Sequence, residues 1–208
     1  MAGIKPITFY NHASGPNPKK VLIVMEELGL AYEKIDIADP KEESFTAINP
    51  NGRLPAIKDP NTDMLLWESG AIMEYLVETY DKEGKLKGAN SKENYLAKQY
   101  LFFQMSGQGP YFGQYVWYSY FDQTNPEARK RYAEQTERVL MVLNNILKGK
   151  KYLVGEKITY ADIAFISWNA TVQGFKETWD SWEVEKKYPD FWAWHTRLME
   201  RPTVKKVM

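Results

Sequence analysis

Every segment of this chain that is patterned like a β-strand lies before residue 82. Up to that point, short apolar runs alternate with helix-type spacing in the order strand, helix, strand, loop, strand, strand, helix. Beyond it, only helical spacing remains. This change of pattern predicts a small α/β layer followed by an all-α bundle, because each half has to bury a different kind of apolar face.

The predicted elements define two domains and a linker. The expected strands are 6–10, 32–37, 54–57 and 64–67, and the expected helices are 20–30, 69–80 and then roughly 92–121, 126–148, 160–172 and 188–200. Gly29 predicts the end of the first helix. The polar, glycine-containing stretch 82–91 lacks periodicity. We therefore expect a domain over 1–82, a linker over 83–91 and an all-helical domain over 92–208.

Composition excludes several kinds of protein and site. The 208 residues carry 27 Lys and Arg against 27 Asp and Glu, so a nucleic-acid partner is not expected. No apolar run approaches the roughly 18 residues of a membrane span, and the first residues do not form a signal peptide, so we expect a cytoplasmic protein without a membrane partner. There is no Cys, which excludes disulfides and a catalytic protein thiol. With only two His, we also expect no metal site.

Two patterns stand out in the second half. Thr159 and Asp162 have the spacing of a capping box at a helix start, and an apolar run follows them, which predicts a central helix. Gly107, Gly109 and Gly113 do not have the spacing of a dinucleotide-binding loop, and no strand precedes them. They predict a kinked or locally opened helix instead.

Chemistry in the first half is concentrated in three loops. Pro55 follows the turn 49–52 at a strand start, and a cis bond there would leave the backbone of Leu54 open to an extended ligand. Ser69 is an N-cap candidate where a strand passes into a helix, and Glu68 adds a carboxylate that could hold an ammonium group. Asn17 lies at the start of the first helix, another electropositive end. Together these loops suit an amino-acid head group, although each is also compatible with ordinary turn and capping chemistry.

These motifs in this order resemble the cytosolic glutathione transferases over essentially the full chain. The matching segments are 14–17 before Lys20 and Val21, 26–30, 49–56, 67–72 and the capping box at 159–162. Within the family, segments 14–17, 67–72 and 101–107 look like the fungal nitrogen-regulator-like (Ure2p-like) group, and the bacterial Nu class is similar. The resemblance implies a thioredoxin-like domain followed by a helical domain, with glutathione as co-substrate and a homodimer as the usual assembly.

The resemblance also implies how glutathione would be activated. Asn17 matches the catalytic Asn that lies near the sulfur in this group. Nu-class enzymes carry a Thr two residues earlier, where this chain has Gly15, and Ser14 precedes it. The glycyl carboxylate would be reached by Arg53 and Lys41.

The remaining glutathione contacts follow from the same resemblance. Pro55 would be the family's cis-proline, and Leu54 would pair its backbone with the cysteinyl part. Glu68 and Ser69 would hold the γ-glutamyl amine and carboxylate.

The acceptor side depends on aromatic residues, of which the chain has 14 Tyr, 9 Phe and 7 Trp. These side chains either pack the helical core and an interface or wall a pocket for a flat apolar ligand. The candidate walls of an acceptor pocket, in a cleft between the two domains, are Ser14, Phe103, Tyr111, Tyr115 and Trp117.

The resemblance implies a detoxifying enzyme in which the glutathione thiolate attacks small hydrophobic electrophiles, and also disulfides or hydroperoxides. Two alternatives remain open: a non-catalytic glutathione- or ligand-binding regulatory protein, and a scaffold domain of the translation-factor type. The regulatory yeast relative carries an Asn/Gln-rich extension that is not found before residue 5 here, and we expect no further fused domain. These two features favour the enzyme.

Overall fold

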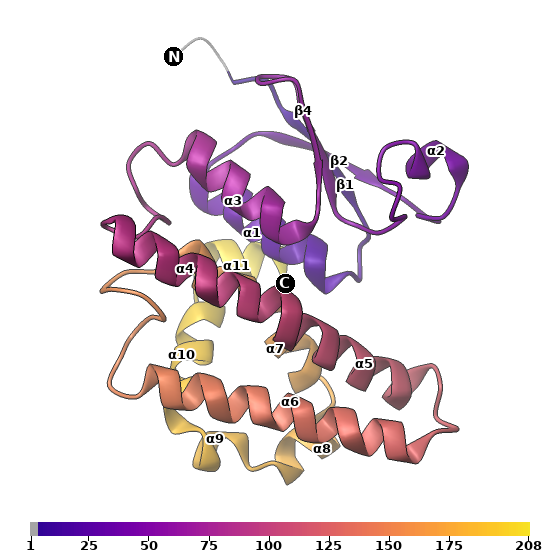
Figure 1. The fold of residues 1–208 in the computed structure, drawn as a ribbon, viewed down its shortest axis with the longest axis vertical. Helices are drawn as coiled ribbons and strands as arrows, with labels where there is room; N and C mark the ends of the chain where they lie inside the picture. Colours follow the sequence, from indigo (N-terminus) through magenta and orange to yellow (C-terminus); the bar gives the residue numbers. More distant parts are fainter. Residues whose placement is uncertain (1–3) are drawn as a thin grey trace. The chain divides into compact units, whose positions relative to one another are not determined.

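The computed structural model describes residues 4–208 and divides the chain into two compact units (Figure 1). Unit 1 runs to Lys87 and also includes Pro202–Met208, and unit 2 is Gly88–Arg201. Unit 1 holds a four-stranded mixed sheet with helices, and the described elements of unit 2 are all helical. The predicted fold class is therefore confirmed.

The sheet of unit 1 has the strand order β2-β1-β3-β4. The elements of this layer are β1 (Ile7–Asn11), α1 (Pro16–Leu28), β2 (Tyr32–Asp36), α2 (Glu43–Thr46), β3 (Ala56–Asp59), β4 (Met64–Trp67) and α3 (Ser69–Tyr80). Strand β1 is parallel to β2 and antiparallel to β3, with Phe9 opposite Lys34 and Ile57. The parallel pair needs a crossover between its strands, and α1 supplies it.

Helix α1 packs on α3, and α3 also contacts β3 and β4. The predicted apolar face of α1 is buried at Val21, Val24 and Met25. The helix ends at Gly29, as predicted: its φ of 64° is left-handed, and its N–H donates to the carbonyl of Glu26. The start differs from the prediction, because α1 begins at Pro16, where a proline without an N–H costs little.

The last helix, α11 (Pro202–Val207), belongs to unit 1, whereas the sequence placed residues 92–208 in one helical domain. It packs on α1. Lys206 Nζ lies 2.8 Å from Glu26 Oε2, and the Thr203 hydroxyl donates to Glu27 at 2.5 Å. These polar contacts join α11 to α1, which are far apart in the sequence. The local sequence around either helix does not predict them.

Unit 2 contains a long helical stretch interrupted by a π-helical turn. Its elements are α4 (Ser91–Phe103), the π-helix η1 (Gln104–Gln108), α5 (Gly109–Tyr120), α6 (Pro126–Leu147), α7 (Tyr160–Gln173), α8 (Lys176–Ser181), α9 (Val184–Lys187) and α10 (Pro189–Met199). A β-carbon on Gly107 would lie 3.1 Å from the Phe103 ring, and one on Gly109 would lie 3.2 Å from the Gln104 carbonyl oxygen. The predicted opening of this helix is confirmed, and the glycines permit its tight backbone approach.

The start of α7 is organised by the buried carboxylate of Asp162. It accepts the backbone N–H of Thr159 at 2.9 Å, which completes the predicted capping box. It also accepts the N–H of Leu153 at 2.9 Å and the indole N–H of Trp194 at 2.9 Å. One side chain therefore joins α7, the loop before it and α10.

Replacing Asp162 by Ala should destabilise the protein more than replacing Thr159 by Ala. Loss of Thr159 removes a cap, at about 0.5–2 kcal/mol. Loss of Asp162 leaves several buried donors unsatisfied at about 1–3 kcal/mol each, so we expect about 3 kcal/mol or more. Urea unfolding followed by circular dichroism measures both. Glu134→Ala, on the exposed face of α6, is the control and should stay within about 0.5 kcal/mol; equal effects of the Thr159 and Asp162 changes would contradict this assignment.

Candidate functional site

The first turn of α1 presents Asn17 at a positive helix end. Gly15 is the N-cap, and Pro16 and Pro18 flank Asn17. Proline carries no N–H, so within 16–18 Asn17 is the residue that brings both a backbone N–H and a side-chain amide to this end. No acidic residue lies in the first turn, so the positive end of the helix dipole is not neutralised from within the helix.

The loop before β3 is shaped by Asn49, whose side chain is buried. Its Nδ2 donates to the Arg53 carbonyl at 2.6 Å, and its Oδ1 accepts the N–H of Asn51 at 3.0 Å. The peptide bond between Leu54 and Pro55 is cis. Asn49 thus positions the backbone that leads into Leu54.

A pocket with a volume of about 350 Å³ joins these two loops. Four predicted glutathione-site residues line it: Asn17, Lys41, Arg53 and Leu54. Six further residues line it to which the sequence assigned no site role, although Gly15, Pro16 and Gly52 lie within the matching motifs; the six are His12, Gly15, Pro16, Pro18, Pro40 and Gly52. The position of His12 directly after β1 was the available signal, since strand ends often carry functional side chains.

The absence of a side chain at Gly52 allows the Lys41 side chain to pack closely against the loop before β3. Its φ is 58°, and a β-carbon would lie 2.8 Å from the Pro40 carbonyl oxygen and 3.1 Å from Lys41 Nζ. The same Nζ donates to the Asn51 carbonyl at 3.0 Å. A side chain at position 52 would clash with the carbonyl oxygen of Pro40 and displace the ammonium group of Lys41. Glycine is therefore required at this position.

The start of α3 carries Glu68 and Ser69, but their roles in the helix differ from the prediction. Glu68 is the N-cap, with a left-handed φ of 70°, and Ser69 is the first helical residue and is buried. Ser69 is therefore not the N-cap, because β4 ends at Trp67 and Glu68 is the single residue between β4 and α3. A left-handed φ costs a non-glycine residue of the order of 1 kcal/mol, and such residues are often found at functional sites.

The starts of α1 and α3 are linked electrostatically by Lys20. Its side chain is fully buried one turn after Asn17. Burial lowers the pKa of Lys20 to about 7, and the charge of Glu68 acts in the opposite direction. Glu68 does not line the 350 Å³ pocket, but its charge is close enough to act on the helix that carries Asn17.

The candidate acceptor residues do not form one group. Tyr115 packs in the core of unit 2, with its ring 5.6 Å from Phe175 and 5.9 Å from Trp182, so it is not available to wall an open pocket. Phe103 packs on Phe165 at 5.9 Å.

The other three acceptor candidates, like Phe103, have at least part of their surface exposed. Trp117 is half exposed and stacks on Phe121 at 5.2 Å. Tyr111 is partly exposed on α5. The hydroxyl of Ser14 lies 3.0 Å from His12 Nδ1, which ties it to a pocket-lining residue.

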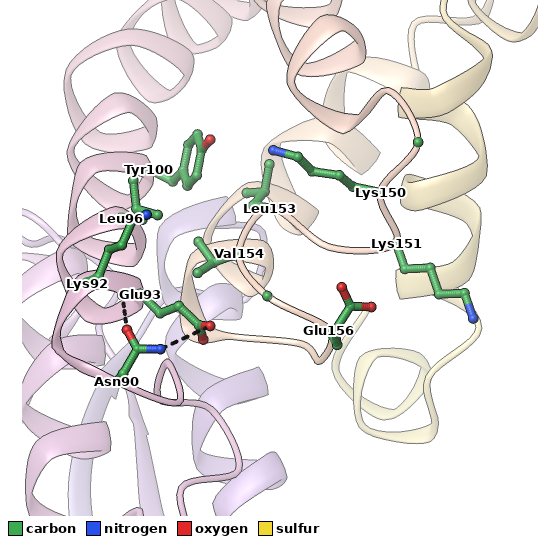
Figure 2. A pocket seen from close by; sticks show the side chains of 12 residues that line it. Asn90, Lys92, Glu93, Leu96, Tyr100, Lys150, Lys151, Leu153, Val154 and Glu156 are labelled. Atoms are coloured by element: carbon green, nitrogen blue, oxygen red, sulfur yellow. Dashed lines mark hydrogen bonds between the residues drawn. The ribbon is translucent and has the colours of Figure 1, made fainter.

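A larger pocket of about 650 Å³ lies within unit 2 between the start of α4 and the loop 149–156 (Figure 2). Its lining includes none of the predicted site residues. The polar contacts at one end are helix capping: Asn90 Oδ1 accepts the N–H of Glu93 at 3.0 Å, and the Glu93 carboxylate accepts the N–H of Ala89 at 2.8 Å. Four predicted glutathione-site residues line the 350 Å³ pocket, whereas none lines the 650 Å³ pocket. The smaller pocket is therefore the candidate site.

Over residues 4–208, no group of three or more His, Asp or Glu side chains is arranged to hold a metal ion. Within the same range, no helix has the length and apolar character needed to cross a membrane.

Comparison with known proteins agrees with this geometry. Two family models match: the N-terminal domain of glutathione S-transferase over residues 5–78, and the C-terminal domain over residues 110–202. The chain is 43% identical to the glutathione S-transferase-like protein gedE of Aspergillus terreus, over all of this chain and 96% of that protein.

Two solved structures from Phanerochaete chrysosporium are also similar. The glutathione transferase URE2P6, in complex with oxidized glutathione, is 42% identical over all of this chain and 96% of its own, with a TM-score of 0.91. Ure2p5, cocrystallized with 1-(S-glutathionyl)-2,4-dinitrobenzene, is 40% identical over all of this chain and 94% of its own, with a TM-score of 0.90. The two domain matches and these relatives show that the chain belongs to the glutathione S-transferase family, in its Ure2p-like group.

Proposed function

We propose that this chain binds glutathione in unit 1 and activates its thiol for attack on small hydrophobic electrophiles. The main support is the 350 Å³ pocket, which joins the Asn17 amide at a helix start to two cationic side chains and the backbone of Leu54. Glutathione carries a thiol and, at its glycyl end, a carboxylate, so a pocket with an amide donor and two cations suits these two groups. The relative URE2P6 was crystallised with oxidized glutathione, which supports the same ligand class.

In this proposal each end of glutathione has its own partners. Lys41 and Arg53 take the glycyl carboxylate, and the backbone of Leu54 before Pro55 pairs with the cysteinyl part. Glu68 and the N-terminus of α3 at Ser69 take the γ-glutamyl ammonium and carboxylate. A helix start binds a carboxylate through its N–H groups, and a side-chain carboxylate binds an ammonium by a charge-assisted hydrogen bond.

Asn17 is the proposed catalytic residue. A free thiol has a pKa of about 8.5, so little thiolate exists at neutral pH. Lowering that pKa by one or two units requires about 1.4–2.7 kcal/mol of preferential thiolate stabilisation. One amide N–H donor at a helix N-terminus supplies about this amount. Asn cannot accept the thiol proton, so it stabilises the thiolate and the proton leaves to solvent.

The acceptor is proposed as a small electrophile, disulfide or hydroperoxide. The relative Ure2p5 was cocrystallized with a glutathionyl-dinitrobenzene, the product of conjugation to an aryl electrophile, which favours the first class. Disulfide and hydroperoxide reduction would need a second glutathione, since the chain has no Cys to resolve a mixed disulfide. The aryl-halide reaction is therefore the first to test.

We also propose a homodimer in the cytoplasm, with a role in detoxification. The dimer has some support in strand β4 at the edge of the sheet, where Met64, Leu65 and Trp67 each expose more than a third of their surface. Exposed apolar side chains on an edge strand are typical of an interaction surface. The cytoplasmic location is proposed from the family alone.

Glutathione-affinity retention followed by turnover assays tests the function. The wild-type chain should be retained and eluted by free glutathione, and it should conjugate glutathione to an aryl halide. Retention without turnover of an aryl halide, a hydroperoxide or a small disulfide would instead identify a glutathione-binding protein without catalysis.

Glu68→Gln and Ser69→Ala should weaken glutathione binding without unfolding unit 1. A charge-assisted bond to the γ-glutamyl head contributes about 1.5–3 kcal/mol, so the dissociation constant for Glu68→Gln should rise about tenfold to a hundredfold. Titration calorimetry measures it, with Glu83→Gln at a highly exposed carboxylate as control. Unchanged binding in both variants would remove the γ-glutamyl assignment.

Asn17→Ala should raise the pKa of the bound glutathione thiol by about one to two units, because one thiolate donor is lost. Turnover should then fall more at pH 6.5 than at pH 8.5, since the donor matters most where thiolate is scarce. Asn17→Asp should raise the pKa further, because it places a negative charge beside the thiolate. Thiolate absorbance against pH measures these shifts, and Asn145→Ala on α6 is the control. An unmoved titration curve would leave Asn17 a turn residue.

Any disulfide reduction should need no protein thiol. Alkylation of the free protein with iodoacetamide, followed by desalting, should leave activity unchanged because the chain has no Cys. Two glutathione molecules then supply both electrons: one thiolate forms the mixed disulfide with the substrate and releases a thiol, and the second resolves it to glutathione disulfide and a second thiol. The rate should depend on glutathione to a higher order than one-site saturation. Aryl-halide conjugation without disulfide or peroxide reduction would leave a plain transferase.

A further inference from the structure

The thiol proton of glutathione needs an acceptor that Asn17 does not provide. In the proposed function the thiolate forms in the 350 Å³ pocket of unit 1. Ionising a thiol breaks its S–H bond, and the proton has to pass to water or to a basic group nearby. Thiol nucleophiles in proteins are commonly activated by an adjacent base. The lining of the pocket is therefore where such a base should be sought.

His12 is the one side chain among the described lining residues that suits this role. Ten residues line the pocket, and none of them is an Asp or a Glu. Lys41 and Arg53 are already protonated at neutral pH, so they cannot take a proton from a thiol. Histidine is the side chain that ordinarily changes charge between pH 5 and 8. His12 is therefore the lining residue with the chemistry of a general base.

A tight turn links His12 to the start of α1. The carbonyl of His12 accepts the N–H of Gly15 at 3.0 Å, and Gly15 is the N-cap of α1. A β-carbon on Gly15 would lie 3.3 Å from the same carbonyl oxygen and 2.9 Å from Pro18 Cδ, so the turn is closely packed. A sulfur at Asn17 shares the pocket with His12, and a general base acts by direct contact or through one water.

The hydroxyl of Ser14 provides the imidazole ring with a partner on its other nitrogen. Ser14 Oγ lies 3.0 Å from His12 Nδ1. A hydroxyl oxygen can accept from Nδ1–H in both the neutral and the protonated ring. The ring has no second hydrogen-bond partner among residues 4–208, so with the proton on Nδ1 the lone pair of Nε2 is available. A contact of this kind sets which nitrogen of a histidine carries the proton.

We propose that His12 is the general base for the glutathione thiol and that Ser14 orients its ring. The S–H bond breaks, its electron pair stays on sulfur as the thiolate, and the proton forms an N–H bond at His12 Nε2. Asn17 and the new imidazolium then both stabilise the thiolate. His12 holds the proton while the sulfur is charged and, being exposed, releases it to solvent once the thiolate has reacted. This inference rests on the proposed function.

Counting protons when glutathione binds tests the inference. Thiolate absorbance measures the thiolate formed, and an indicator dye in weak buffer at neutral pH measures the protons released to solvent. The wild type should release less than about half a proton per thiolate, because His12 retains it, whereas His12→Gln should release about one. The matched control is Lys19→Gln, a partly exposed residue at the same helix start that does not line the pocket, and it should match the wild type.

Two further measurements separate a base from a structural role. S-methylglutathione has no thiol proton, so it should bind equally to the wild type and to His12→Gln. Aryl-halide turnover at pH 6.5 should fall about tenfold or more in His12→Ala, and added imidazole should restore part of it. Imidazole should not restore Asn17→Ala, which lacks a donor rather than a base. If His12→Gln does not fold, His12→Asn carries the same proton count.

The outcomes distinguish this inference from the proposed function. A wild type that does not bind glutathione, or that forms no thiolate, overturns the proposed function itself. A wild type that forms the thiolate and releases about one proton for each overturns the role of His12 alone. Equal weakening of glutathione and S-methylglutathione binding in His12→Gln overturns it as well, and so does a loss of turnover in His12→Ala that imidazole leaves unchanged.

Discussion

The helical unit depends on one buried carboxylate. Asp162 accepts hydrogen bonds from the backbone of Thr159 and Leu153 and from the indole of Trp194, so the start of α7, the loop before it and α10 share a single acceptor. A buried charge is tolerated only when such donors replace its lost hydration. Because α7 is buried along most of its length, its start has to be fixed without solvent, and Asp162 provides that anchor.

In unit 1 the corresponding constraint is on the backbone. The site is built where strands pass into helices and where a loop enters β3, so its groups are mostly N–H donors, carbonyls and short side chains held by turns. Asn49 holds the loop from inside, and Gly52 lets Lys41 approach it. In the proposed function a chain without Cys stabilises a thiolate in this way, because the stabilisation would come from fixed donors and a helix end rather than from a protein nucleophile.

The sequence predicted those parts of the structure whose causes are local. The four strands of the sheet, the end of α1 at Gly29, the opened helix near Gly107 and the capping box at Thr159 all depend on residues that are neighbours in the chain, and all are confirmed, whereas the short helices α2, α8 and α9 were not predicted. The position of α11 on α1 was not predicted, because it depends on contacts with Glu26 and Glu27 across most of the chain length. Capping by Glu68 instead of Ser69 was missed for another reason. A side-chain preference for the N-cap does not reveal a left-handed φ imposed by the tight passage from β4 to α3.

Glu68 also shows why the site and the stability of the fold favour different residues. A left-handed backbone would be less strained with glycine or asparagine at this position, and the fully buried Lys20 on α1 is a second unfavourable feature of unit 1. Burial lowers the pKa of Lys20 to about 7, and the charge of Glu68 offsets only part of that effect. Glycine at 68 would relieve the backbone but would remove the carboxylate that the proposed γ-glutamyl site requires. The proposed glutathione site therefore accounts for a residue that the backbone conformation at position 68 would not favour.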